Sequence, residues 1–384
     1  MESDVFEQLL QSVRDFVRGR LVPLEKKVEE DDAVPDEIVA EMREMGFFAL
    51  TIPTEYGGLG LTSAEEARVA MEIGWTSPAF RSVFGTTIGI GSQGIVIDGT
   101  DEQKSKYLPG MARGELIASF CLTEPNSGSD AASLKTTAER FEGGYRLNGT
   151  KRYITNAPRA GVFTVMARTD RKSDGASGVS AFIVDADTAG ISLGRPERKM
   201  GQRGTHVCDV IFADCFVPDS ALIGGVEGKG FRTAMKVLDR GRLHVAAFCV
   251  GTADRLIDEM VRYADGRTQF KKRISEFQLI QAMIADSEVE KEAARALVLQ
   301  SAHMRDTDEP IVKAAAMSKY YASEMVGRVA DRAVQVFGGA GYIAEYCVER
   351  FYRDVRLFRI YEGTSQIQQL VIAREVLNEH RRQG

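Results

Sequence analysis

The chain has 384 residues, 44% of them hydrophobic and 27% charged, which is typical of a globular protein of two or three domains with a large core. Its net charge is −6 and no run of Lys and Arg stands out, so a nucleic-acid partner is not expected. No apolar run approaches the roughly 18 to 20 residues that a membrane-spanning helix needs, so a membrane protein is not expected either.

The first part of the chain is helical in pattern. Val5, Leu9, Val13 and Val17 recur at the spacing that places side chains on one face of a helix. Further helical patterns follow before the residue pattern becomes strand-like. We therefore predict an N-terminal helical domain over residues 1–115.

The middle part reads as strands. Short runs rich in β-branched and aromatic residues, at 161–167, 180–184 and 210–212, alternate with turn signals such as Asn148-Gly149. Strands joined by tight turns are typical of a small antiparallel barrel or sandwich. We predict an antiparallel β-barrel domain over residues 116–228.

The last part returns to long amphipathic helices, with a Gly-rich break at 337–342. Helices of this length predict a C-terminal four-helix bundle over residues 229–384. The fold class is thus α+β and multidomain, in the order helices, strands, helices.

The cysteines are odd in number and scattered, with no C-x-x-C, so they predict buried thiols and not disulfides or a zinc site. The acidic start of the chain lacks the features of a secretory or transit segment, and the end lacks a peroxisomal tripeptide, so we expect a cytoplasmic protein without a metal site. The cysteines are Cys121, Cys208, Cys215, Cys249 and Cys347.

Five segments stand out, in order along nearly the whole chain: 122–130, 148–156, 267–270, 335–341 and 360–367. Together they resemble the FAD-dependent acyl-CoA dehydrogenase family. The resemblance implies FAD as cofactor, an acyl-CoA substrate, electron-transfer flavoprotein as partner and a homotetramer. No G-x-G-x-x-G follows a strand, which disfavours a Rossmann NAD enzyme.

Glu362 is the expected catalytic base. The α-proton of a thioester is weakly acidic, so its removal needs a carboxylate in a dry pocket that raises its pKa. The alternative is a solvated glutamate at a helix start. The resemblance also places Tyr361 and Gly363 against the substrate. Some relatives carry the base on the first bundle helix instead, at the position of Gly241.

By resemblance, two groups of residues hold FAD. The first lies around the flavin ring, and Ser129 of this group is near both the FAD phosphate and the substrate. The second holds the pyrophosphate and adenosine, typically across a subunit interface, although its glycines alone would also fit a helix-capping loop. The first group is Phe120, Leu122, Thr123, Ser129, Tyr153 and Thr155; the second is Arg267, Gln269, Phe270, Gln335, Gly338, Gly339, Thr364 and Gln366.

Arg81 is the most informative residue for the substrate. Its context resembles glutaryl-CoA dehydrogenases and sulfinopropionyl-CoA desulfinases, in which this arginine meets a distal anion. Gly74 and Gly85 replace the Glu and Ser of the glutaryl pattern. The alternative is an ion pair with a structural acid, Glu72 or Asp98.

Two more residues could line the active site. Arg242 matches a family arginine at the CoA end of the ligand, and the alternative is a salt bridge within the bundle. His244, two positions later, could be a polar wall, although a structural or surface role is the default for each of the four histidines.

The sequence leaves three functions open. The first is α,β-desaturation of an acyl-CoA, with Glu362 as base, hydride transfer to FAD and electrons passed to electron-transfer flavoprotein. The second is a non-oxidative flavoprotein acting on an anionic acyl-CoA, such as a sulfinopropionyl-CoA desulfinase, or a dicarboxyl-CoA dehydrogenase. The third is a silent CoA- or FAD-binding protein, which an intact Glu362-Gly363 disfavours.

Overall fold

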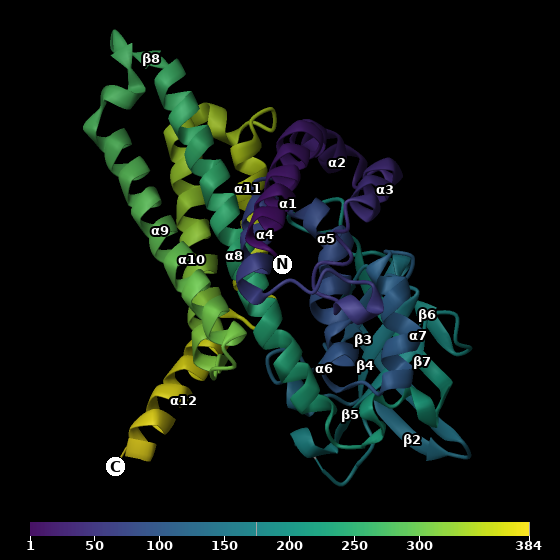
Figure 1. The fold of residues 1–384 in the computed structure, drawn as a ribbon. Helices are drawn as coiled ribbons and strands as arrows, with labels where there is room; N and C mark the ends of the chain where they lie inside the picture. The colour runs from purple at the N-terminus through teal and green to yellow at the C-terminus, as the bar shows by residue number, and fades with distance from the viewer. Residues whose placement is uncertain (174, 384) are drawn as a thin grey trace.

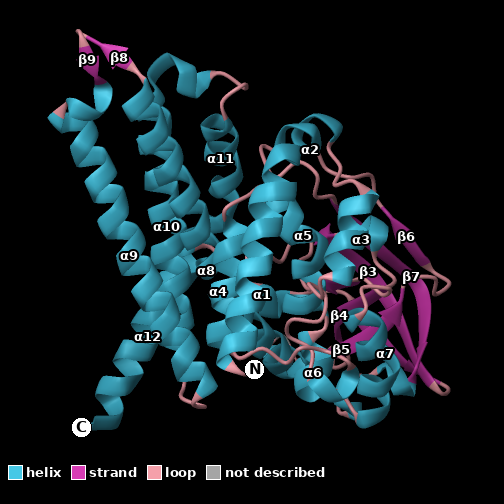
Figure 2. Ribbon diagram, turned by 45° about the horizontal axis from the view of Figure 1, so that its top comes forward, coloured by secondary structure: helices cyan, strands magenta, loops and turns pink. Residues whose placement is uncertain are grey.

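The computed structural model describes residues 1–173 and 175–383, arranged as N-terminal helices, a β-sheet and C-terminal helices (Figure 1). This order confirms the predicted fold class. Figure 2 shows the large sheet on one side of the molecule and the long helices on the other. No helix among the described residues is long and apolar enough to cross a membrane.

Two of the N-terminal helices, α4 and α7, begin at capping boxes. Thr62 and Thr100 each form a capping box with the residue three positions later, Glu65 and Gln103. The buried face of α1 differs from the predicted one: Phe6 and Leu10 are buried with Val13, and Val5 is exposed. The helices are α1 (Ser3–Phe16), α2 (Glu25–Asp31), α3 (Asp36–Glu44), α4 (Ser63–Gly74), α5 (Pro78–Thr86), α6 (Gln93–Asp98) and α7 (Asp101–Ala112).

The middle sheet is mostly antiparallel, with the order β1-β4-β2-β3-β7-β6 and β5 paired to β4. The pairs β1–β4 and β2–β4 are parallel, which the alternating strand pattern did not predict. Tyr145, Phe163 and Phe182 belong to the core of the sheet. The strands are β1 (Ala118–Cys121), β2 (Thr137–Phe141), β3 (Gly144–Thr155), β4 (Val162–Arg168), β5 (Val179–Asp185), β6 (Ile191–Leu193) and β7 (Val207–Pro218).

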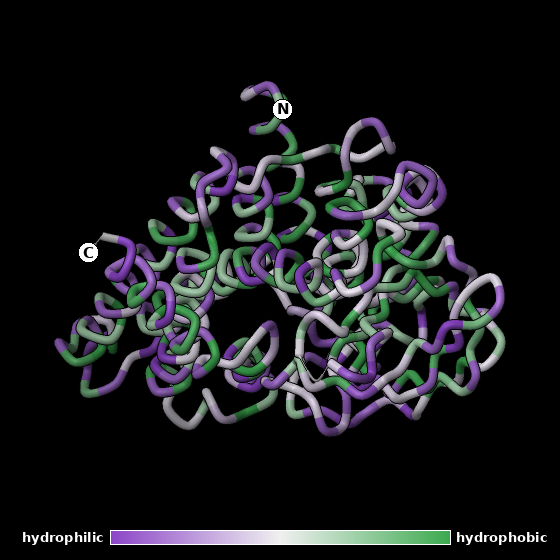
Figure 3. Tube along the Cα trace, turned by 90° about the horizontal axis from the view of Figure 1, so that it is seen from below, coloured by the Kyte–Doolittle hydropathy of each residue, from purple (hydrophilic) through white to green (hydrophobic). Residues whose placement is uncertain are grey.

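The C-terminal helices α8, α9 and α10 run side by side, and α12 extends from one end of them (Figure 1). A short ribbon, β8–β9, lies at the other end. Figure 3 shows hydrophilic stretches at the outer edges of the molecule, the last turns of α12 among them. The elements are α8 (Gly230–Gly266), β8 (Thr268–Gln269), β9 (Lys272–Arg273), α9 (Gln278–Asp306), α10 (Val312–Phe337), α11 (Cys347–Val355) and α12 (Ser365–Gln383).

Helix α8 connects the three parts, because it packs against the N-terminal helices, the sheet and the other long helices. Two glycines let α4 and α8 approach closely. A Cβ at Gly74 would lie 2.4 Å from the Phe248 carbonyl oxygen, and a Cβ at Gly251 would lie 1.8 Å from that of Met71. The glycine that breaks the glutaryl pattern at position 74 therefore has a packing reason.

Candidate active site

Glu362 lies in the tight loop that precedes α12. Its φ of 57° and the φ of 87° at Gly363 are both in the left-handed region, where a residue other than glycine is strained. Three side chains hold the loop by its carbonyls: Arg242 Nε donates to Glu362 O at 3.4 Å, Gln368 Nε2 to both carbonyls at 3.1 and 3.0 Å, and Lys319 Nζ to Gly363 O at 2.7 Å. The strained conformation is thus fixed from three sides.

Glu362 is half-buried, and its buried Oε2 has no hydrogen-bond partner among the residues that the structure describes. A Cβ at Gly241 would lie only 2.5 Å from this oxygen, so the glycine makes the space that the carboxylate occupies. Burial raises the pKa of Glu362, while Arg81, Arg242 and Lys319 act to lower it. A desolvated carboxylate with a raised pKa is suited to abstract a proton near neutral pH.

A cavity of about 420 Å³ opens beside Glu362 on the sheet side. Tyr153 stands at its wall because a β-bulge between β3 and β7 places it at φ 57° and leaves 56% of it exposed. The wall combines aromatic and aliphatic side chains with threonine hydroxyls. It contains every residue that the sequence assigned to the flavin ring: Phe120, Leu122, Thr123, Ser129, Tyr153 and Thr155.

A buried ion pair that the sequence analysis did not single out holds this wall together. Lys151 Nζ donates to Glu124 Oε1 at 2.7 Å and to the Leu122 carbonyl at 3.2 Å. The same carboxylate accepts the backbone amides of Lys135 and Thr136 at 2.6 and 2.9 Å. The pair connects the 122–130 motif to the 148–156 motif. The presence of a glutamate in one motif and a lysine in the other could have suggested this ion pair from the sequence.

A second cavity of about 70 Å³ shares Thr155, Tyr361 and Glu362 with the first and continues toward α5. Arg81 lines it, and Gly85 gives its side chain room, since a Cβ there would lie 3.1 Å from Arg81 Nε. The smaller cavity is thus a narrow extension of the larger one, with Arg81 in its wall.

The expected alternative for Arg81, an ion pair with Glu72 or Asp98, is wrong. Glu72 pairs with Arg14 at 2.6 Å, and Asp98 pairs with Lys236 at 2.8 Å. Arg81 has no salt bridge among the described residues, and its buried Nε has no hydrogen-bond partner there. An unpaired, partly buried guanidinium is costly unless a ligand supplies the counter-charge.

For Arg242 the structure shows the salt bridge within the bundle, and contact with the CoA end of the ligand stays a prediction. Arg242 Nη1 donates to Asp239 at 2.6 Å, an ion pair within α8, while the side chain also lines the larger cavity. Gly363 and Ile367 line the same cavity from the other side.

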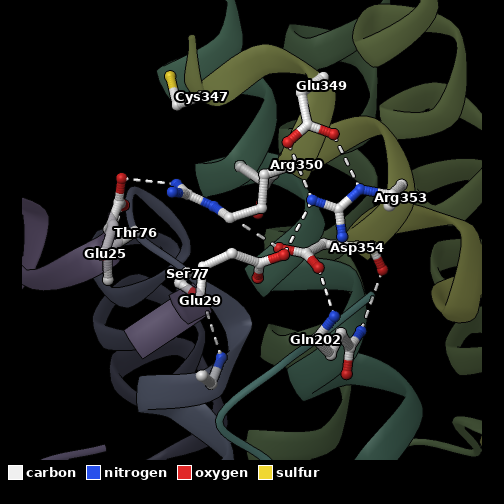
Figure 4. A network of polar contacts seen from close by, with 12 residues as sticks. Glu25, Glu29, Thr76, Ser77, Gln202, Cys347, Glu349, Arg350, Arg353 and Asp354 are labelled. Carbon is white, nitrogen blue, oxygen red and sulfur yellow. Dashed lines mark hydrogen bonds and ion pairs between the residues drawn. The ribbon is translucent and has the colours of Figure 1, made fainter. Parts of the chain in front are cut away.

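The smaller cavity is walled in part by Gln202, which a polar network connects to distant elements (Figure 4). Gln202 Nε2 donates to the Asp354 carbonyl of α11 at 3.1 Å, and its backbone amide donates to Asp354 Oδ1. One turn earlier in α11, Arg350 Nη2 donates to Glu25 of α2 at 2.6 Å. Burial raises the pKa of Asp354 to about 6.

The residues expected around pyrophosphate and adenosine lie elsewhere. Most of them line a third cavity of about 840 Å³, where the β8–β9 ribbon meets the end of α10, and Phe270 there is 88% exposed. Thr364 caps α12, since its Oγ1 accepts the Ile367 amide at 3.2 Å. Gln335 and Gln366 are exposed. The third cavity is lined by Arg267, Gln269, Phe270, Gly338 and Gly339, among others.

Comparison with known proteins identifies the family of the chain. Three family models match the chain: acyl-CoA dehydrogenase N-terminal domain at residues 3–115, middle domain at 119–215 and C-terminal domain at 228–377. The chain belongs to the acyl-CoA dehydrogenase family. As a family member, it is an oxidoreductase of the acyl-CoA dehydrogenase and reductase type, and the family is FAD-dependent.

Individual relatives of this acyl-CoA dehydrogenase family member span its full length. It is 41% identical over 371 residues to a 3-(aryl)acrylate reductase of Clostridium sporogenes, covering 97% of this chain and 98% of the relative. It is 42% identical over 367 residues to subunit CarC of the caffeyl-CoA reductase–Etf complex of Acetobacterium woodii, covering 95% and 96%. The structure of butyryl-CoA dehydrogenase from Megasphaera elsdenii superposes with a TM-score of 0.94 at 34% identity, covering 98% and 99%.

The family's cofactor fits the larger cavity. A flat ring system with a polar edge needs apolar faces and hydrogen-bonding groups at the rim, which Phe120 and Leu122 supply together with Thr123 and Thr155. Within the described residues no group of His, Cys, Asp and Glu could hold a metal ion.

Proposed function

We propose that this family member transfers two hydrogens between an acyl-CoA thioester and FAD, with Glu362 as the proton-transferring group. One observation carries the proposal: the carboxylate of Glu362, with its buried and unpartnered Oε2, lies where the larger cavity meets the smaller one. A thioester whose tail enters the smaller cavity would present its α-carbon to this carboxylate.

The loop around Glu362 also supplies a site for the thioester oxygen. The amide N–H of Glu362 has no acceptor in the part of the chain that the structure describes, so it is free to donate to that oxygen as negative charge develops on it. The loop is held by hydrogen bonds from Arg242, Lys319 and Gln368, which fix the position of the amide relative to the carboxylate.

The same residues serve both directions of the reaction. In dehydrogenation Glu362 takes the α-proton, and in reduction it returns that proton to the same carbon. FAD, when bound, supplies the hydride chemistry at the β-carbon. The relatives include two proteins named as reductases, and we expect the net direction here to depend on the electron partner, for which we propose electron-transfer flavoprotein.

We propose a homotetramer, and the position of the third cavity supports contact between subunits. Arg267, Gln269 and Phe270 line a cavity with no residue in common with the one beside Glu362, so they would complete the FAD site of another subunit. Exposed apolar side chains nearby, Phe270, Leu279 and Tyr342, are suited to a subunit contact. A cytoplasmic location remains our proposal.

Arg81 favours an acyl tail with an anionic end. This observation fits a dicarboxyl-CoA dehydrogenase, and it also fits elimination of a sulfinate without net oxidation. The two differ in the fate of the flavin, because only dehydrogenation reduces it.

The test is anaerobic bleaching of the purified flavoprotein by neutral, dicarboxyl and sulfinyl acyl-CoA thioesters. We expect at least one thioester to bleach the flavin, and Glu362→Gln to abolish bleaching by it. Glu379→Gln, which removes an exposed carboxylate of α12, is the matched control and should leave the rate unchanged. Absence of bleaching by the whole panel, with sulfite released from the sulfinyl thioester, would refute dehydrogenation.

A further inference from the structure

His244 of α8 is buried, with 4% of its surface exposed, and it lines the smaller cavity together with Arg81 and Tyr361. Its Nδ1 lies 3.1 Å from Glu66 Oε1. Its Nε2 is buried and has no hydrogen-bond partner among the described residues. A buried imidazole with one nitrogen free toward a cavity needs a partner that the chain does not supply.

The residues behind His244 fix where its proton lies. Arg240 donates hydrogen bonds from Nε and Nη2 to Glu66 Oε2 at 3.0 and 2.7 Å, and from Nη1 to Gln93 Oε1 at 2.9 Å. The amide group of Gln93 in turn donates to Thr51 at 3.2 Å. Although burial opposes it, Arg240 and His244 lower the pKa of Glu66 to about 2. Glu66 is therefore an acceptor, so we infer that the imidazole proton lies on Nδ1 and that the unpartnered Nε2 of this cavity-lining residue carries the lone pair.

The end of this cavity thus offers two unsatisfied groups of different kinds. Arg81 offers N–H donors and a positive charge, and His244 Nε2 offers a site that can share a proton. An alkyl tail would leave both groups without partners, at the desolvation penalty of a buried polar atom. A carboxyl group satisfies both, because one oxygen accepts from Arg81 and the other shares a proton with Nε2.

We propose that His244 is a specificity-determining residue that binds a terminal carboxyl group of the acyl tail together with Arg81, and that one proton is taken up from solvent as this group binds. The inference rests on the proposed acyl-CoA function and names its substrate class. His244 would be the second carboxyl-binding residue beside Arg81. In the glutaryl pattern a Glu and a Ser accompany the arginine, and here Gly74 and Gly85 replace them.

The charges around His244 explain the proton uptake. Glu66 of α4, Arg81 of α5 and Arg240 of α8 face it, and Lys199, Tyr361 and Glu362 line the same cavity. Burial, with Arg81 next in size, lowers the pKa of His244, which favours the neutral imidazole in the free enzyme. A bound carboxylate offsets the charge of Arg81 and favours the imidazolium, whose second N–H then bonds to the ligand.

Calorimetric binding to the holoenzyme tests this directly. Two unreactive CoA thioethers, 4-carboxybutyl-CoA and pentyl-CoA, differ only at the tail end, and titration in buffers of different ionisation enthalpy counts the protons taken up. We expect close to one more proton with the carboxyl ligand at pH 7.5. His244→Gln should abolish this excess and weaken the carboxyl ligand about tenfold to a hundredfold, as loss of a charged hydrogen bond does, with little effect on pentyl-CoA. His303→Gln, on an exposed histidine, is the control and should match wild type.

The proposal is overturned if both ligands take up equal numbers of protons, if the excess persists in His244→Gln, or if wild type does not bind the carboxyl ligand more tightly than pentyl-CoA. If the variant does not fold, the wild-type pH series decides: the Kd ratio of the two ligands should change by up to tenfold per pH unit. Bleaching by reactive thioesters reports on Glu362 independently, so failure of the proposed function would be recognised separately.

Discussion

Gly241→Ala tests whether Glu362 works from the position that the structure gives it. The new Cβ would lie 2.5 Å from Glu362 Oε2, 3.0 Å from Cδ and 3.1 Å from Oε1. Carbon and oxygen need about 3.4 Å, so the carboxylate must move by roughly 1 Å. A misplacement of that size costs about a hundredfold in rate, or about 2.7 kcal/mol of transition-state stabilisation.

The fold should tolerate Gly241→Ala, because the clash is with the end of a flexible side chain and alanine gains up to about 1 kcal/mol in a helix interior. We therefore expect flavin reduction by acyl-CoA, measured by anaerobic rapid mixing, to slow about a hundredfold without a fall in the melting temperature. Gly19→Ala, where nothing lies within 4 Å of the new Cβ, is the control.

A double-mutant cycle makes the reasoning refutable. Glu362→Asp draws the carboxylate back by one methylene group, so the methyl group of Gly241→Ala should then cost less than about threefold. Two results would show that the glycine does not act by making room for the carboxylate. One is an equal hundredfold loss of the flavin-reduction rate when Gly241→Ala is added to the Glu362→Asp variant. The other is a rate for Gly241→Ala alone that lies within threefold of wild type.

Three further changes have defined outcomes. Dehydrogenation needs ionised Glu362, so activity decreases when the pH is below the pKa of that group. Arg81→Met removes a cation that lowers this pKa, so the acidic limb of the kcat/KM profile for a neutral thioester should move to higher pH. An unmoved limb would contradict the assigned charge interaction. Glu124→Gln leaves Lys151 unpaired in the core and should lower the free energy of unfolding in urea by about 3 kcal/mol; a change under about 0.5 kcal/mol would mean that the pair is not needed. Lys319→Met should reduce kcat about tenfold and also raise the pKa of Glu362, since Lys319 both holds the loop and lowers that pKa; a purely structural lysine would leave the pH profile in place.

Much of the fold could be predicted from local patterns. Helical spacing predicted α1, but the spacing fits more than one face, and only packing against the neighbouring helices selects Phe6 and Leu10 as buried in place of Val5. The parallel pairing of β1 with β4 could not be predicted, because it depends on which strands meet in space and not on the alternation within each.

The site divides in the same way. The motifs predicted the base and the residues around the flavin ring, which the structure brings together in one cavity. The partners of Arg81 could not be found in the sequence, since the acids proposed for it are taken by other cations. The space at Gly241 and the free nitrogen of His244 follow from side chains that are more than a hundred residues apart and converge only in the folded chain.

The polar network in Figure 4 has a consequence for the evolution of substrate choice. Gln202 is held by Asp354, whose helix is tied through Arg350 to Glu25 near the start of the chain. The position of Gln202 in the wall of the smaller cavity therefore depends on residues that do not line the cavity themselves. We therefore expect substitutions in α2 or α11 to change selectivity even where the lining residues stay the same. Redesign of the enzyme for a new thioester should randomise these anchor positions together with the cavity.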